Sequence, residues 1–271
     1  MKGIYLLLGV LSLINTATFA NGQGNEGKEE KETEIREVEN NAFIAGERLD
    51  YTISYGFFSA AKASLEVKQY KSKIHGREIL HVVGIGRSIS AWDWFFPVRD
   101  RYETFIDKKG IFPWLFIRRI DEGGYKKSQD YQFYQDKGEV TNEKNETYKI
   151  PHGVQDMLSA FYYARTMDFS NAKKGDVFEI TSFIDEEVYP LILEYGGKKT
   201  VKVKTGKFDC LVFHPKVQQG RVFKTKEDLT FYITDDENKI PVLVKANVKL
   251  GSVKMELDGY KNLANPLLSK R

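Results

Sequence analysis

Short segments in which apolar and polar residues alternate recur at intervals of about ten to fifteen residues through most of this chain. Residues 49–55 and 63–67 show the pattern clearly, and turn signals such as Asp136-Lys137-Gly138 separate neighbouring segments. Alternation with a period of two places successive side chains on opposite faces of a strand. Short strands joined by short turns predict antiparallel pairing, because parallel neighbours need long crossover connections.

The alternating segments favour a mainly β fold, and so does an aromatic content of 13%, since aromatic residues are enriched in strands. The strands that we expect are 49–55, 63–67, 78–85, 102–106, 115–120, 125–134, 139–141, 147–150, 177–183, 188–195, 199–204, 207–213, 229–234, 240–249 and 252–257. We predict one β-rich domain over residues 42–265, with a curved antiparallel sheet or an incomplete β-barrel.

One segment has helical rather than strand periodicity. Apolar residues at 154, 157, 158, 161 and 164 follow the spacing of one helix face. Asp156 in the first turn and Arg165 in the last turns suit the helix dipole, so we expect both to orient the helix rather than to touch a ligand. The pattern predicts one principal α-helix, over about 154–167, packed on or into the sheet.

The N-terminus has the order of features found in a secretory signal peptide. Lys2 precedes an apolar run from Ile4 to Ile14, and the small residues Thr18 and Ala20 fit a signal peptidase site. We predict a signal peptide over residues 1–20, cleaved after Ala20, and an exported, periplasmic bacterial protein. Residues 21–41 are almost wholly polar, which predicts a flexible leader. No other run is long and apolar enough to predict a transmembrane span.

Motifs for catalysis and metal binding are missing from the sequence. The four histidines have no metal-ligand spacing, and Cys210 is the single cysteine. There is no nucleophile elbow, dinucleotide fingerprint or phosphate loop. Without the signal peptide the chain carries 40 basic and 38 acidic residues, too even a balance to indicate a nucleic-acid partner. We therefore predict no catalytic residue, metal or cofactor.

The segment 91–98 has the most unusual local composition, because it holds Trp92, Trp94, Phe95 and Phe96 within five residues. These four side chains carry a large apolar surface. One interpretation is a loop that grips an acyl chain, a sugar face or a partner protein. The other is a loop tucked over the end of the barrel as a hydrophobic plug.

Arg118 and Arg119 are adjacent in an expected strand, so they must point to opposite faces of the sheet. An arginine that faces the interior needs a partner if it is buried. A polar interior would suit a ligand with an anionic group, and we predict that one of the two arginines contacts it. A salt-bridged sheet with solvent on that face is the alternative.

An ordered series of short motifs resembles a family of exported bacterial proteins, the domain of unknown function 3108. The motifs that carry the resemblance are 43–51 (FIAGERLDY), Arg99-Asp100, Pro113 with 116–119 (FIRR), Glu122-Gly123, 155–165 (QDMLSAFYYAR), 205–210 (TGKFDC) and the hairpin from Thr234-Asp235 to Ile240-Pro241. The resemblance covers about residues 43–260. It implies export and a β-rich fold, with no established activity, and at fold level it is similar to open-barrel carriers of acyl chains in the bacterial envelope.

Three functions fit these observations. The first is a non-enzymatic periplasmic binding or carrier protein for an apolar or amphipathic, lipid-like envelope component. Its predicted contacts are Trp92, Trp94, Phe95 and Phe96 for the apolar part and Arg118 or Arg119 for the anionic part. The second is a structural or assembly protein whose aromatic loop docks another envelope protein. The third is an envelope glycan hydrolase, which would need two carboxylates facing each other in a cleft.

Overall fold

The strands of this protein form one large antiparallel sheet. The computed structural model describes residues 35–216, 229–248 and 251–271. The strands are β1 Arg48–Tyr55, β2 Phe58–Gln69, β3 Ile79–Ser88, β4 Arg99–Asp107, β5 Pro113–Glu122, β6 Tyr125–Tyr134, β7 Glu139–Asn142, β8 Thr147–Lys149, β9 Val177–Ile184, β10 Glu187–Val203, β11 Gly206–Pro215, β12 Leu229–Thr234, β13 Pro241–Val248 and β14 Gly251–Lys261. The helices are α2 Ser90–Asp93 and α3 Ser159–Thr166.

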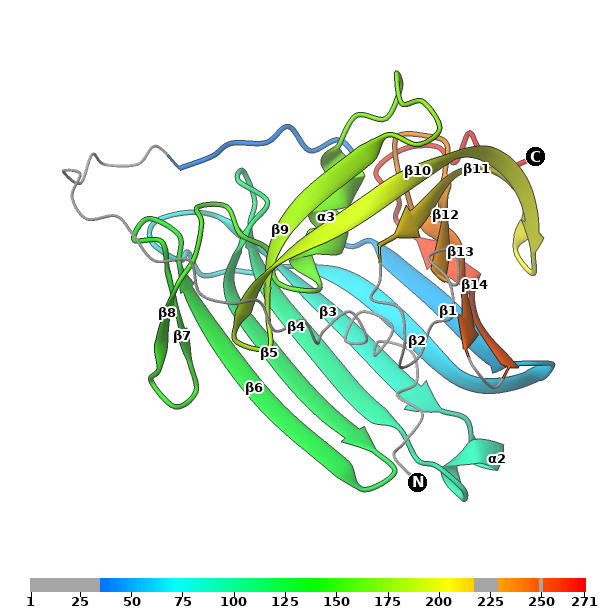
Figure 1. Cartoon of the computed structure of the whole chain (residues 1–271), viewed down its shortest axis with the longest axis horizontal. Coiled ribbons are helices and arrows are strands. Elements are labelled where there is room, and N and C mark those ends of the chain that lie inside the picture. The colour runs from blue at the N-terminus through cyan, green and yellow to red at the C-terminus, as the bar shows by residue number, and fades with distance from the viewer. Residues whose placement is uncertain (1–34, 217–228, 249–250) are drawn as a thin grey trace.

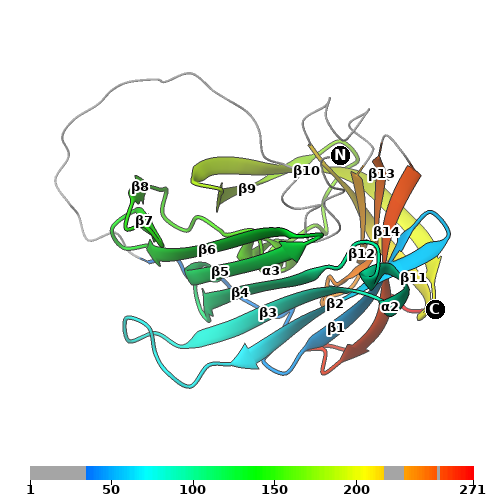
Figure 2. The ribbon, with the colours of Figure 1, turned by 90° about the horizontal axis from the view of Figure 1, so that it is seen from below.

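The sheet is a meander that fails to close at one place. Its strand order is β8-β7-β6-β5-β4-β3-β2-β1-β14-β13-β12-β11-β10-β9, so the first and last strands pair with each other. The free edges are β8 and β9, which are consecutive in sequence and are separated by the segment that holds α3 (Figure 1). The sheet bends so that β3–β6 and β10–β14 form two walls (Figure 2). The fold is therefore an open, barrel-like sheet.

The predicted fold class is confirmed, and most strands lie where alternation placed them. The two strands predicted at 188–195 and 199–204 are wrong, because β10 is one strand of 17 residues. Its pairing with β11 shifts register between Tyr195 and Gly197. Gly197 has φ +96°, a backbone conformation open to glycine, so the bulge bends the strand without ending it.

Helix α3 is shorter than predicted at its N-terminal end. Gln155 donates its N–H to the carbonyl of Thr181 and accepts the N–H of Phe183, so this residue is extended against β9. The helix begins only after Asp156, whose Oδ1 accepts the N–H groups of Leu158 and Ser159 at 2.7 and 2.8 Å. Asp156 therefore caps the helix, as an acceptor just before the first turn does.

The inner faces of both walls pack against α3. Tyr162 is fully buried and shares a core cluster with residues of β3–β6, including Val82 and Phe116. Ala160 belongs to a second cluster, which contains Ile180 and Phe213 of the other wall. Burial of apolar side chains on both sides of α3 stabilises the helix inside the concave face.

A buried ion pair ties α3 to the sheet. Arg165 donates from Nη1 and Nη2 to the two carboxylate oxygens of Glu47 at 2.6 and 2.7 Å. Its Nε and Nη2 also donate to the carbonyls of Asn238 and Ala42, both at 2.9 Å. The Arg165 side chain is 1% exposed and that of Glu47 is fully buried. Because these bonds use both charges fully, the pair fixes the helix between β1 and the β12–β13 turn.

A second buried polar cluster lies on the inner face of β4 and β5. The carboxyl groups of Asp100 and Glu122 are 3% and 5% exposed. Burial, and then the neighbouring Asp100 carboxyl group, raise the pKa of Glu122 to about 8. Burial also raises the pKa of Asp100. Two carboxyl groups in contact cannot both ionise without a large cost, so Glu122 keeps its proton at neutral pH.

The N-terminal limit of the contacts with the sheet lies within the predicted leader. Residues 1–34 fall outside the described residues, and with them the predicted signal peptide and most of the leader. Arg36 donates to the carbonyls of Gly110 and Ile111 at 3.1–3.2 Å, and its guanidinium lies 4.4 Å from the ring centre of Tyr163. Residues 35–41 therefore lie against the domain.

Arg165→Ala should lower the free energy of unfolding by about 3–5 kcal/mol, because it leaves the Glu47 carboxylate buried without a partner. Arg119→Ala is the matched control, since its ion pair with Asp130 is about 40% exposed at both side chains. The control should lose at most about 1 kcal/mol. Urea denaturation of the two variants measures both values, and equal losses would contradict the anchoring role of Arg165.

The stability of the protein should fall as the pH rises from 6 to about 8. The pKa of Glu122 is raised in the folded state to about 8 from an ordinary value of 4.5. Its contribution is therefore complete below about pH 4.5 and is lost as the pH rises through about 8. Glu122→Gln should remove on the order of 2 kcal/mol of this pH dependence. Glu139→Gln, in the exposed β7–β8 hairpin, should leave it unchanged when unfolding is measured at both pH values.

Candidate functional site

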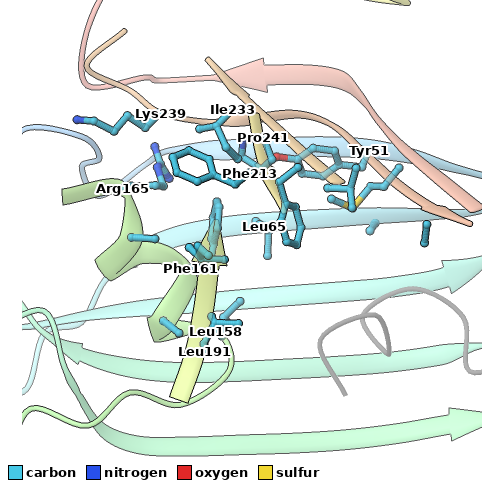
Figure 3. Close-up of a pocket in the computed structure, with 18 of the residues that line it drawn as sticks. Tyr51, Leu65, Leu158, Phe161, Arg165, Leu191, Phe213, Ile233, Lys239 and Pro241 are labelled. Atoms are coloured by element: carbon cyan, nitrogen blue, oxygen red, sulfur yellow. The ribbon is translucent and has the colours of Figure 1, made fainter. Parts of the chain in front are cut away.

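An apolar pocket of about 140 Å³ lies between α3 and the inner face of the sheet (Figure 3). It is the space that the incomplete closure of the sheet leaves beside the helix. Its lining residues come from both walls and from the helix: Tyr51, Ala63, Ser64, Leu65, Leu158, Ala160, Phe161, Ala164, Arg165, Phe169, Leu191, Leu193, Phe213, Phe231, Ile233, Lys239, Pro241, Val244, Ala246, Val253 and Met255. Nearly all of them present aliphatic or aromatic carbon, so the pocket suits a hydrocarbon chain.

The pocket has a charged end at Arg165 and Lys239, which lie near each other beside Phe161 in Figure 3. The guanidinium of Arg165 is consumed by Glu47 and two backbone carbonyls. The ammonium of Lys239 differs, because it makes no hydrogen bond or ion pair with any residue in the described parts of the chain. Lys239 therefore offers a free positive charge at the end of an apolar pocket.

Local structure holds Lys239 in place. It follows Asn238 in the β12–β13 turn and has φ +45°, a left-handed conformation. The carbonyl of Asn238 accepts from Arg165, and its side-chain nitrogen donates to the carbonyl of Asn265 at 3.0 Å. The turn is thus bound both to the helix and to the C-terminal segment, and the position of the lysine is fixed by its neighbours.

The electrostatic surroundings of Lys239 leave room for an anion. Burial lowers its pKa, while the charges of Asp168, Glu237 and Asp236 act in the opposite direction and that of Arg165 lowers it further. None of the three carboxylates is within ion-pair distance of the ammonium. A half-buried cation without a contacting partner favours a ligand that brings a negative group.

None of the six residues singled out in the sequence lines this pocket. Arg118 is buried on the inner face, where its Nη1 donates to Gln129 and to Asp185, each at 3.0 Å. Arg119 points to the other face and pairs with Asp130. The expected opposite orientation of the two arginines is therefore confirmed. Because Arg118 ties β5 to the β9–β10 turn, it stabilises the open side of the sheet, and a ligand contact by either arginine stays a prediction.

The aromatic segment is divided between packed and exposed residues. Trp92 and Phe96 are half-buried, and Phe96 lies so close to Gly123 that a Cβ there would come within 2.3 Å of its ring. Trp94 and Phe95 are 91% and 75% exposed. The four residues lie on and after α2, at an end of the strands and outside the pocket. Their role as ligand or partner contacts is thus a prediction that the pocket geometry does not test.

Two further structural findings concern other classes of site. Within residues 35–216, 229–248 and 251–271, no three His, Cys, Asp or Glu side chains are placed to hold a metal ion. No helix of these same residues is long and apolar enough to cross a membrane. The Asp100–Glu122 carboxyl pair is buried and does not line the pocket, so it does not form the open cleft with two carboxylates that a glycan hydrolase needs.

Comparison with solved structures supports the description of the fold. A β-barrel-like protein of domain of unknown function DUF1849 from Brucella abortus has a TM-score of 0.51 at 12% identity, over 84% of this chain and 99% of that chain. A protein from Parabacteroides distasonis described as a lipoprotein has a TM-score of 0.35 at 11% identity, over 84% of this chain and 100% of that chain. At such identity the likeness to the Brucella protein shows the fold alone.

Sequence families give the remaining comparison. No curated protein matches the sequence. A family described as a protein of unknown function, DUF3108, matches residues 50–258, from the second half of β1 to the last strand. The predicted family is therefore confirmed, and the chain belongs to the DUF3108 family of proteins of unknown function.

Proposed function

We propose that this protein is a non-enzymatic binding or carrier protein for an amphipathic anion, whose hydrocarbon chain lies in the pocket between α3 and the sheet. The single observation that carries the proposal is the combination of an almost wholly apolar lining with the unpaired ammonium of Lys239 at one end. A neutral hydrocarbon would use only the lining. An anion without a hydrocarbon chain would use only the lysine.

The size of the hydrophobic term makes such binding effective. Burial of each methylene group contributes about 0.8 kcal/mol, so even a short acyl chain can supply most of the affinity. The lysine then fixes the direction of the chain and adds a charge-assisted hydrogen bond to a carboxylate or phosphate. An acyl chain with an anionic head group is the simplest ligand that satisfies both ends of the pocket.

The place of action that we propose is the bacterial envelope, most simply the periplasm. The support is the signal-like order of Lys2, the apolar run 4–14 and the small residues up to Ala20. In that compartment an acyl chain in transit between membranes must be shielded from water. A pocket inside an open sheet gives this shielding without catalysis.

The affinity for straight-chain carboxylates should rise with chain length. Between octanoate and laurate, each methylene group should lower the Kd about fourfold until the pocket is full. Ala164→Phe places a ring in the pocket from α3 and should abolish the chain-length dependence. Thr166→Phe, on the same helix but outside the lining, should bind as the wild type does. Isothermal titration calorimetry measures the series, and an unchanged Kd across it would contradict the proposal.

Replacement of Lys239 should separate the two parts of the ligand. Lys239→Gln should weaken laurate binding about tenfold, because it removes a charged hydrogen-bond donor, and should leave 1-dodecanol within about twofold. Lys245→Gln is the matched control, since this lysine is exposed on β13 and does not line the pocket. An equal loss for laurate and 1-dodecanol would show that Lys239 acts through packing rather than through charge.

A further inference from the structure

Exposed aromatic side chains gather at one end of strands β1–β6, away from the pocket lining. Phe57 and Phe58 are in the β1–β2 connection and are 101% and 69% exposed. Trp94 and Phe95 follow β3, and Tyr125 begins β6 and is 49% exposed. Because the strands form an antiparallel meander, these three connections lie at the same end of the sheet. We call these five residues the aromatic rim.

Contacts between the connections join the rim into one surface. The carbonyl of Pro97 accepts the N–H of Gly123 at 2.8 Å, and Phe96 lies against the same glycine. On the other side, the N–H of Ile89 donates to the carbonyl of Ala60 at 3.0 Å. The segment with α2 is thus attached both to the β5–β6 turn and to the start of β2 (Figure 1). Trp94 and Phe95 are presented by a supported segment.

A row of cations lies directly behind the rim. Lys62 pairs in register with Arg87, and Arg87 with Arg99, across β2, β3 and β4. All three residues are exposed, so their side chains share the outer face. Asp258 neutralises Lys62 and Asp93 neutralises Arg99. Arg87 has no ion pair among the described residues. Like charges directly opposite one another destabilise a sheet, which indicates that another requirement maintains the row.

We propose that the aromatic rim docks the protein on the surface of an anionic lipid bilayer. Trp, Tyr and Phe side chains have the amphipathic or apolar character that suits the boundary between head groups and acyl chains. Cations set just behind them lie at the depth of the lipid phosphates. No pocket of defined shape accompanies the five residues, so they fit a deformable lipid surface better than a shaped protein surface.

The rim also lies near one end of the pocket. Val253, which lines the pocket, pairs with Tyr55 beside the β1–β2 connection. Lys239 belongs to the β12–β13 turn, at the other end of the strands. A bilayer contact at the rim would therefore bring membrane lipid close to the end of the pocket opposite the lysine. The docking proposal goes beyond the binding function and does not require it.

Vesicle co-sedimentation of the chain without residues 1–20 tests the proposal. Wild-type protein should sediment with vesicles of phosphatidylethanolamine and phosphatidylglycerol, and its tryptophan emission should shift to shorter wavelength as Trp94 leaves water. The double variant Trp94→Ser, Phe95→Ser should lose at least about tenfold in binding. Leu268→Ser is the matched control, because Leu268 is 81% exposed but lies in the C-terminal segment, near the start of β11, and should bind as the wild type does.

A charge variant and a second readout separate the outcomes. Arg87→Gln should weaken binding to the anionic vesicles and leave any binding to phosphatidylcholine vesicles unchanged. Laurate binding by the double variant should equal that of the wild type, which separates failure of docking from failure of the pocket. Sedimentation of the double variant at the wild-type level would overturn the proposal. So would a wild-type protein that ignores both vesicles while a crosslinker at Phe95 captures a protein.

Discussion

The buried ion pair between Glu47 and Arg165 is the interaction on which the rest of this structure depends. It joins α3 to the start of the domain, and through the carbonyl of Asn238 it also holds the β12–β13 turn. Without it the helix would leave two buried charges unpaired, which is far more costly than the loss of an exposed pair. The same contact positions Lys239, so the charged end of the pocket follows from the anchoring of the helix.

The failure of the sheet to close has a direct structural reason. Strands β8 and β9 would complete a barrel if they paired, but the chain between them carries α3 into the concave face instead. Gln155 bridges to β9, and Arg118 binds Asp185 in the turn after it, so the open side is supported without a continuous ladder. The helix fills part of the interior and leaves the apolar pocket beside it. An open sheet and an internal pocket are thus consequences of one insertion.

Sequence reasoning predicted the fold well and the pocket poorly. Alternation of apolar and polar residues is a local signal, and it located nearly every strand, although the glycine-assisted bulge in β10 was taken for a break. The adjacent positions of Arg118 and Arg119 also fixed their opposite faces. Lys239 was missed because a lysine in an acidic turn resembles an ordinary surface residue. Its proximity to Phe161 and Arg165 depends on long-range pairing of β1 with β14, for which the sequence contains no local signal.

The most direct test of the proposed binding function is native mass spectrometry of the protein isolated from the cells that produce it, before and after organic extraction. We expect an additional mass that matches an anionic lipid or fatty acid, that is lost on extraction and that is missing from the Ala164→Phe variant. A bare polypeptide mass in the wild-type protein, unchanged after incubation with laurate, would contradict the assignment of the pocket as an acyl-chain site.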